Sequence, residues 1–377
     1  MKILTLVERR ADYSRMRPIL KELYNNPFFE VYLVVTGICL LDLHGGDINF
    51  IKEDNFPIDA ELEMFEPKIR NTNKSMVKAL SKILGSITEE LDKFKPDLVL
   101  TGFDIGANLA TTIAAAHMNI PVAHIQGGEL TGSIDESIRH AMSKFSHIHF
   151  PATEDARQRL IRMGENPDYV FNVGCPSIDT ILETPEMNKK ILEEKFNIDF
   201  SQPNILLIQH PVTTESGSSR NQILTTIEVI NEMDIQALVA LPNNDAGSSE
   251  IIDEIKNSKL CWYPSLSTYE FVNVYRNIGA IVGNSSSGIH ESSTFGIPAV
   301  NIGTRQKDRE RANNVIDVSY DKDSIRLGIE KALFDVKFRK DIENISNPYG
   351  DGKSSKRIIE LLKTVNLDGI VQKRFYE

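Results

Sequence analysis

The feature that most constrains the fold is a repeated alternation of short, apolar, β-branched runs with longer segments of helical period. Each short run has the length and composition of a buried strand, and each longer segment carries apolar residues every three or four positions. Consecutive parallel strands need a crossover connection, which is usually a helix. The sequence therefore predicts an α/β fold built on parallel sheets.

The alternation occurs in two series. The first predicts strands at Ile3–Val7, Val31–Thr36, Leu98–Thr101, Val122–Ile125, Ile148–Phe150 and Tyr169–Val173. The second predicts strands at Ile205–Ile208, Ala237–Leu241, Leu260–Tyr263, Ala280–Val282 and Val300–Ile302. A polar helical segment at Glu183–Asp199 lies between the two series. The main helices are expected at Ser14–Tyr24, Lys74–Phe94, Ala107–His117, Glu136–Lys144, Glu154–Met163, Gln222–Glu232, Ser267–Arg276, Ser287–Phe295 and Ser354–Val365.

A chain of 377 residues exceeds what one hydrophobic core usually supports, so two domains are expected. We predict an N-terminal Rossmann-like domain at 1–175, a C-terminal one at 176–360, and a tail at 361–377 that packs back on the first. Ligands of parallel sheets bind beyond the carboxyl ends of the strands. Here those ends face an interdomain cleft. This is a glycosyltransferase-B-like architecture.

The composition excludes several kinds of partner. A net charge of −11 argues against nucleic acid or an anionic membrane as the main partner. No apolar run approaches the roughly 18 residues that a membrane span needs, and the N-terminal run is too short for a signal peptide. The cysteines, Cys39, Cys175 and Cys261, are odd in number and far apart, which suits a reducing compartment. We expect a cytoplasmic protein.

The most informative loop, 283–288, reads Gly-Asn-Ser-Ser-Ser-Gly and joins a strand to a helix. Backbone N–H groups and the hydroxyls of Ser285 and Ser286 would meet there at a positive helix end, which favours an anion. An ordinary serine N-cap is the alternative. Glu291 follows in the same helix, where it can accept bonds from ribose hydroxyls, and Arg305 follows the next strand, where it can bind a phosphate.

Two further loops of the second series follow strands. His210 comes directly after Ile205–Ile208, so it faces the cleft and can donate to a leaving diphosphate; a structural histidine is the alternative. Asn244 and Asp245 lie in the loop 242–247, where they can meet a base or sugar, or simply form a turn.

The first series supplies the charged residues. Arg9 or Arg10 follows the first strand, within reach of a phosphate, and Ser14 caps the next helix. Asp104 follows another strand, while Asp135 lies near a helix start, where an acid is often only a cap. Carboxylates that face an anion site across a cleft have the geometry that proton-transfer chemistry needs.

Several other sites are unsupported. No GxGxxG follows the first strand, and neither a GxxxxGK[ST] loop nor a GxSxG elbow occurs. His147 and His149 share a strand face, but no third ligand is evident, so core packing explains them better than a metal. No motif requires a metal or a cofactor.

Together the motifs resemble the hydrolysing UDP-N-acetylglucosamine 2-epimerases over nearly the whole chain, in order and with compatible spacing. The resemblance rests on RADYS (10–14), HIQGGELTGSIDESIRHA (124–141), GCPSIDT (174–180), QHPVTT (209–214), PNNDAGS (242–248), GNSSSGIHE (283–291), GTRQ (303–306) and YGDG (349–352). It implies a glycosyltransferase-B fold with a sugar side in the first domain and a nucleotide side in the second. It also implies a homodimer or homotetramer, and a product that feeds sialic acid-type sugar synthesis.

The resemblance also implies a reaction: elimination of UDP from UDP-N-acetylglucosamine to a 2-acetamidoglucal, then hydration to N-acetylmannosamine and free UDP. By matched position, Asp104 and Asp135 transfer protons, and His210 assists the departing diphosphate. Gln126 occupies a catalytic position. The UDP-sugar would be held by Arg10, Ser14, Glu129, Asn244, Asp245, Ser285, Ser286, Glu291 and Arg305.

The chain departs from the family at Cys39, Ile105, Ala107 and Gln126, where a histidine, an arginine, an acid and a glutamate are usual. A glutamine cannot transfer protons, so either Asp104, Asp135 and Glu129 share the work differently or the sugar differs. A UDP- or GDP-linked 2,4-diacetamido-6-deoxy sugar, as used for legionaminic acid, would suit the more apolar pocket. The motifs also leave open a non-hydrolysing epimerase, a glycosyltransferase of this fold and a non-catalytic nucleotide-sugar binder.

Overall fold

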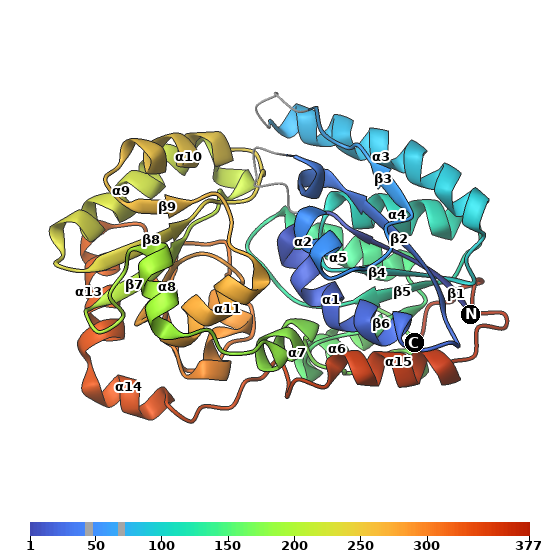
Figure 1. The fold of residues 1–377 in the computed structure, drawn as a ribbon. Helices are drawn as coiled ribbons and strands as arrows, with labels where there is room; N and C mark the ends of the chain where they lie inside the picture. Colours follow the sequence, from blue (N-terminus) through green and yellow to red (C-terminus); the bar gives the residue numbers. More distant parts are fainter. Residues whose placement is uncertain (42–47, 67–71) are drawn as a thin grey trace.

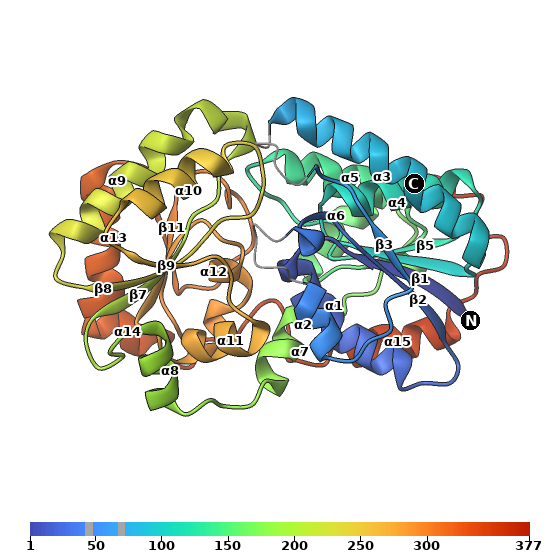
Figure 2. The ribbon, with the colours of Figure 1, turned by 45° about the horizontal axis from the view of Figure 1, so that its top comes forward.

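The computed structural model describes residues 1–41, 48–66 and 72–377. They form two lobes, each built on a six-stranded sheet with helices on both faces (Figures 1 and 2). The first sheet has the strand order β3-β2-β1-β4-β5-β6, and the second has β12-β11-β10-β7-β8-β9. Neighbouring strands pair in parallel in both sheets, which confirms the predicted glycosyltransferase-B-like α/β class.

The strands follow the predicted pattern closely. The first sheet contains β1 (Lys2–Val7), β2 (Glu30–Thr36), β3 (Ala60–Leu62), β4 (Leu98–Gly102), β5 (Val122–Ile125) and β6 (Ile148–Phe150). The second contains β7 (Asn204–Ile208), β8 (Gln236–Ala240), β9 (Cys261–Tyr263), β10 (Ala280–Gly283), β11 (Ala299–Ile302) and β12 (Val315–Val318). Sequence reasoning missed β3 and β12, because each is a short edge strand of mixed burial with a weak apolar signal.

The strand predicted at Tyr169–Val173 is wrong. Pro167–Tyr169 forms a 3₁₀ turn, in which the Asn166 side chain accepts a bond from the Asp168 amide, and Val170 alone makes a bridge to His149. A proline at the first position of the turn and an asparagine cap outweigh the β propensity of the residues that follow.

Helices connect the strands. Those of the first lobe are α1 (Arg10–Tyr24), α2 (Ile48–Glu53), α3 (Asn73–Phe94), α4 (Gly106–His117), α5 (Ile134–Phe145) and α6 (Glu154–Arg162). The rest are α7 (Pro176–Glu183), α8 (Lys189–Phe196), α9 (Ser219–Glu232), α10 (Ser248–Asn257), α11 (Thr268–Asn277), α12 (Ser287–His290), α13 (Lys322–Phe334), α14 (Val336–Ile342) and α15 (Ser354–Thr364). The helix predicted at Ser287–Phe295 is shorter than expected, since α12 gives way to a 3₁₀ turn at Ser292–Phe295.

Each sheet is buried on both faces, as continuous apolar strands require. In β1, Ile3 and Val7 pack into one cluster, while Leu4 and Leu6 pack into another on the opposite face. The same alternation divides β7 between two clusters. These cores hold the carboxyl ends of the strands rigidly, and the candidate site lies at those ends.

The C-terminal segment returns to the first lobe. Helix α15 runs beside α1 (Figure 1), and its Ile358, Ile359 and Leu362 belong to the same core cluster as Ile3. Beyond α15, Lys373 donates from Nζ to the carbonyl oxygen of Ser143 at the end of α5. Helix α15 spans the boundary that we predicted at residue 360, and it packs with the first lobe as a whole. The predicted division into domains stays a prediction.

Candidate active site

One cavity lies between the lobes, at the carboxyl ends of both sheets, and residues from both lobes line it. Most of the residues predicted from the sequence are on its wall: Arg10, Ser14, Asp104, Gln126, Glu129, Asp135, His210, Ser285, Ser286, Glu291 and Arg305. Asn244 and Asp245 are not on this wall; their neighbour Asn243 is, and its Nδ2 donates to Asp245 Oδ2 at 2.7 Å. The structure thus gathers residues from distant parts of the chain into one chamber.

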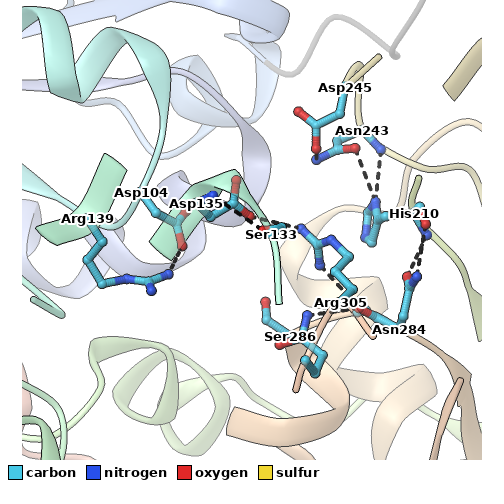
Figure 3. Close-up of polar contacts among 12 residues, drawn as sticks. Asp104, Ser133, Asp135, Arg139, His210, Asn243, Asp245, Asn284, Ser286 and Arg305 are labelled. Carbon is cyan, nitrogen blue, oxygen red and sulfur yellow. Dashed lines mark hydrogen bonds and ion pairs between the residues drawn. The ribbon is translucent and has the colours of Figure 1, made fainter. Parts of the chain in front are cut away.

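Asp104 is an ionised carboxylate held by arginines. It follows β4, and its Oδ2 accepts a bond from Arg139 of α5 (Figure 3). Its Oδ1 lies 3.5 Å from Arg9 Nη2. Burial would raise the pKa of Asp104, but the charges of Arg139 and Arg9 outweigh it and hold that pKa below its usual range. Asp104 is therefore negatively charged at neutral pH.

The pKa of Asp135 is displaced in the opposite direction, above its usual value. Asp135 lies in the first turn of α5, where its backbone N–H donates to Ser133 Oγ, and its Oδ2 is 3.6 Å from Arg305 Nη2 of the other lobe (Figure 3). Burial raises the pKa of Asp135, the negative charge of Asp104 raises it further, and Arg305 opposes both. Two carboxyl groups whose pKa values are displaced in opposite directions can take different parts in acid–base chemistry.

Glu129 bridges the two lobes. Its Oε2 lies 3.1 Å from His290 Nε2 and 3.4 Å from Arg309 Nε, and both partners belong to the second lobe. Burial would raise the pKa of Glu129, yet His290 and Arg309 keep it well below its usual value. Its Oε1 accepts a bond from Gln126 Nε2 at 2.9 Å. Glu129 is thus held ionised and in one orientation by its partners on both sides of the cavity.

His210 is neutral and fixed in orientation. Its backbone N–H donates to Asn284 Oδ1 at 2.7 Å, and its Nδ1 accepts from the backbone N–H of Asn243 at 3.2 Å (Figure 3). Burial lowers the pKa of His210 well below its usual value, and the charge of Arg305 lowers it further. With Nδ1 as an acceptor, the neutral ring carries its proton on Nε2, where it can donate to a ligand.

The serine loop differs from the prediction in one respect. Helix α12 has four residues, so its dipole is too short to provide the expected positive end. The hydroxyls remain: Ser287 donates to Ser285 Oγ at 2.9 Å, and Ser286 Oγ lies 3.4 Å from Arg15 Nη2. Hydroxyls and arginines, more than a helix end, make this wall suited to an anion.

The residues that depart from the family pattern are buried. Ile105 and Ala107 are buried at the start of α4, and Cys39 is buried near the end of β2. The Ala107 backbone N–H donates to Glu8 Oε2 at 2.8 Å, so the acid that directly follows β1 approaches the start of α4. Burial raises the pKa of Glu8 to about 7.

Sequence reasoning missed Arg15, Arg139, His290 and Arg309 as residues of the cavity wall. One of them carried a usable signal: Arg139 lies in the helix predicted at Glu136–Lys144, four positions after Asp135, which directly precedes that helix. In α5, which contains both residues, this spacing places them on one face. The others come together only through the packing of the two lobes.

The fold and the chamber define a glycosyltransferase-B-like α/β protein with a polar, charged ligand site between its lobes. The family model described as UDP-N-acetylglucosamine 2-epimerase matches residues 21–363, and the chain belongs to this family of nucleotide-sugar 2-epimerases. A "UDP-N,N'-diacetylbacillosamine 2-epimerase (hydrolyzing)" of Legionella pneumophila is 39% identical over 370 residues, covering 97% of this chain and 96% of the relative.

Other relatives agree with the family assignment. A UDP-N-acetylglucosamine 2-epimerase of Neisseria meningitidis is 29% identical, covering 100% of this chain and 99% of the relative. The crystal structure of a Neisseria meningitidis UDP-GlcNAc 2-epimerase bound to UDP-GlcNAc has a TM-score of 0.83 and 23% identity, covering 97% of this chain and 100% of that one. Within the described ranges, no helix is long and apolar enough to cross a membrane.

Proposed function

We propose that this protein is a hydrolysing 2-epimerase that acts on a UDP-linked 2-acetamido sugar. The observation that carries the proposal is the pair Asp104 and Asp135, two carboxyl groups with oppositely displaced pKa values on one cavity wall. Removal of the C2 proton and cleavage of the C1–O bond to UDP give a 2-acetamidoglucal. Water then adds, with its hydroxyl at C1 and a proton at C2, to form the epimer.

Because the configuration at C2 inverts, the proton leaves one face of the sugar and returns to the other, so two groups are needed. Asp135 is the better suited to exchange a proton, since burial and the charge of Asp104 raise its pKa above the usual value. Asp104 stays ionised between Arg139 and Arg9 and is the second carboxylate within the chamber. The neutral imidazole of His210 and the guanidinium of Arg305 would stabilise the negative charge that develops on the departing UDP.

For the sugar, we propose N,N′-diacetylbacillosamine. Two relatives named for this sugar support it: the Legionella protein, and a "GDP/UDP-N,N'-diacetylbacillosamine 2-epimerase (hydrolyzing)" of Campylobacter jejuni at 32% identity. Apolar side chains on the cavity wall, among them Ile38 and Phe103, suit a 6-deoxy sugar. UDP-N-acetylglucosamine, from the resemblance and the Neisseria relative, is the second candidate.

The test incubates the protein with UDP-N,N′-diacetylbacillosamine, its GDP analogue or UDP-N-acetylglucosamine in D₂O, and follows free nucleotide and C2 deuterium by NMR. Release of UDP with deuterium at C2, fastest with the diacetamido sugar, supports the proposal. Epimerisation without release of UDP would identify a non-hydrolysing enzyme. Release only with an acceptor would identify a glycosyltransferase, and binding without turnover a nucleotide-sugar binder. Cytoplasmic location and a homodimeric or homotetrameric state stay predictions.

A further inference from the structure

Gln126 presents a buried acceptor to the cavity. The residue is 2% exposed, lies on the cavity wall and has a left-handed backbone, with φ 57°. Its Nε2 donates to Glu129 Oε1 at 2.9 Å. Its Oε1 has no hydrogen-bond partner within the ranges that the structure describes. Buried carbonyl oxygens are rarely left in this state, so this one is matched to a partner that arrives from outside.

The orientation of this amide is fixed by its neighbours. Rotating the amide by 180° would bring its oxygen against Glu129, whose carboxylate is ionised and held by His290 and Arg309. Oxygen against oxygen is repulsive, whereas the N–H that now faces Glu129 is attractive. The amide therefore keeps its N–H groups toward Glu129 and its oxygen free for a ligand that donates a hydrogen bond.

Thr131 supplies a second buried group on the same cavity wall. Its Oγ1 has no hydrogen-bond partner among the residues described, although its backbone N–H donates to Glu136 Oε2 at 2.7 Å. Unlike the amide oxygen of Gln126, a hydroxyl can donate as well as accept. The wall thus offers one group that only accepts and one that can donate.

A secondary amide carries the complementary pair, an N–H that donates and a C=O that accepts. We infer that Gln126 and Thr131 hold an acetamido group of the sugar, with its N–H bonded to Gln126 Oε1 and its carbonyl oxygen to Thr131 Oγ1. This inference rests on the proposed function, because it takes the ligand to be a UDP-linked 2-acetamido sugar. Gln126 is then a positioning residue that selects and orients the sugar, which explains why it need not transfer a proton.

The inference predicts discrimination between sugars. A site with buried polar groups rejects a ligand that leaves them unpaired, so UDP-glucose should bind about 10- to 100-fold more weakly than UDP-N-acetylglucosamine. Gln126→Met and Thr131→Val remove one polar group each and should reduce this ratio about tenfold, while the affinity for UDP alone stays the same. Gln158→Met, an exposed change on α6, is the matched control and should keep the full ratio.

Surface plasmon resonance under continuous flow measures these affinities, because fresh ligand replaces any that is turned over. Gln126→Glu adds a pH readout: an ionised carboxylate beside Glu129 should make the affinity for UDP-N-acetylglucosamine fall as pH rises, more steeply than in the wild type. An unchanged ratio in both Gln126→Met and Thr131→Val, with UDP still bound, would overturn the inference. If the wild type binds no UDP, the proposed function itself fails.

Discussion

Glu8 makes a testable contribution to the pH dependence of stability. The residue is 3% exposed, and its Oε2 accepts a hydrogen bond from the Ala107 backbone N–H at 2.8 Å. Burial raises the pKa of Glu8 from 4.5 to about 7, although the charge of Arg9 opposes the shift. Glu8→Gln keeps an acceptor for the Ala107 N–H and removes the ionisation.

The sign and size follow from linkage. Between pH 4.5 and about 7 the folded protein keeps a proton on Glu8 that the unfolded chain has released, so Glu8 makes the free energy of unfolding decrease as pH rises. One pKa unit corresponds to about 1.4 kcal/mol, so the loss is roughly 3 kcal/mol by pH 8. Glu8→Gln escapes this loss and should gain roughly that amount, relative to the wild type, between pH 4.5 and pH 8.

Urea unfolding followed by circular dichroism at pH 4.5 and at pH 8 measures this difference. Difference infrared spectroscopy of the protonated carboxyl C=O stretch should also show a group that titrates near pH 7 in the wild type and is missing in Glu8→Gln. Glu194→Gln, an exposed change on α8, is the control. If the free-energy difference between Glu8→Gln and the wild type is the same at both pH values, Glu8 does not carry a raised pKa and the reasoning is refuted.

Three further substitutions test the lobe contact, the charged pair and the tail. A Cβ at Gly132 would lie 1.8 Å from the Thr304 carbonyl oxygen of the other lobe, so Gly132→Ala should force the lobes apart. The affinity for UDP, measured by calorimetry, should then fall about tenfold or more. An unchanged affinity would contradict this prediction. Arg139→Gln leaves Asp104 short of its main partner and should cost about 3–5 kcal/mol in chemical unfolding. Lys373→Met removes donors to backbone carbonyls at the end of α5, so amide exchange in the tail should accelerate; protection equal to the wild type would speak against this role.

Much of the fold followed from the sequence because buried parallel strands are apolar throughout. Runs such as Ile205–Ile208 and Val122–Ile125 lie within observed strands of matching length. The edge strands β3 and β12 were missed because their exposure is mixed, and Tyr169–Val173 was misassigned because a proline turn decided its conformation. Local sequence patterns predict secondary structure reliably where a strand is buried along its whole length. They fail where tertiary contacts or a single residue determine the conformation.

Sequence reasoning also predicted some residues of the candidate site correctly and others not. Position after a strand placed Asp104 and His210 correctly on the cavity wall, since parallel strands all present their carboxyl ends to one edge. The same rule placed Asp245 in the right loop but not on the wall, because the loop turns its neighbour Asn243 toward the cavity instead.

The sequence by itself determined the α/β class, the order of elements, the family and most of the side chains available for chemistry, because these depend on local period and on motifs. Only the tertiary structure decided what each ionisable group does. Glu8, Glu129 and Asp135 are all acids after strands or at helix starts, yet burial and neighbours raise the pKa of the first and third and lower that of the second. Several of those neighbours are distant in the sequence, since His290 is 161 residues from Glu129 and Ala107 is 99 residues from Glu8. The energy of a buried charge depends on distances that only the packed structure establishes.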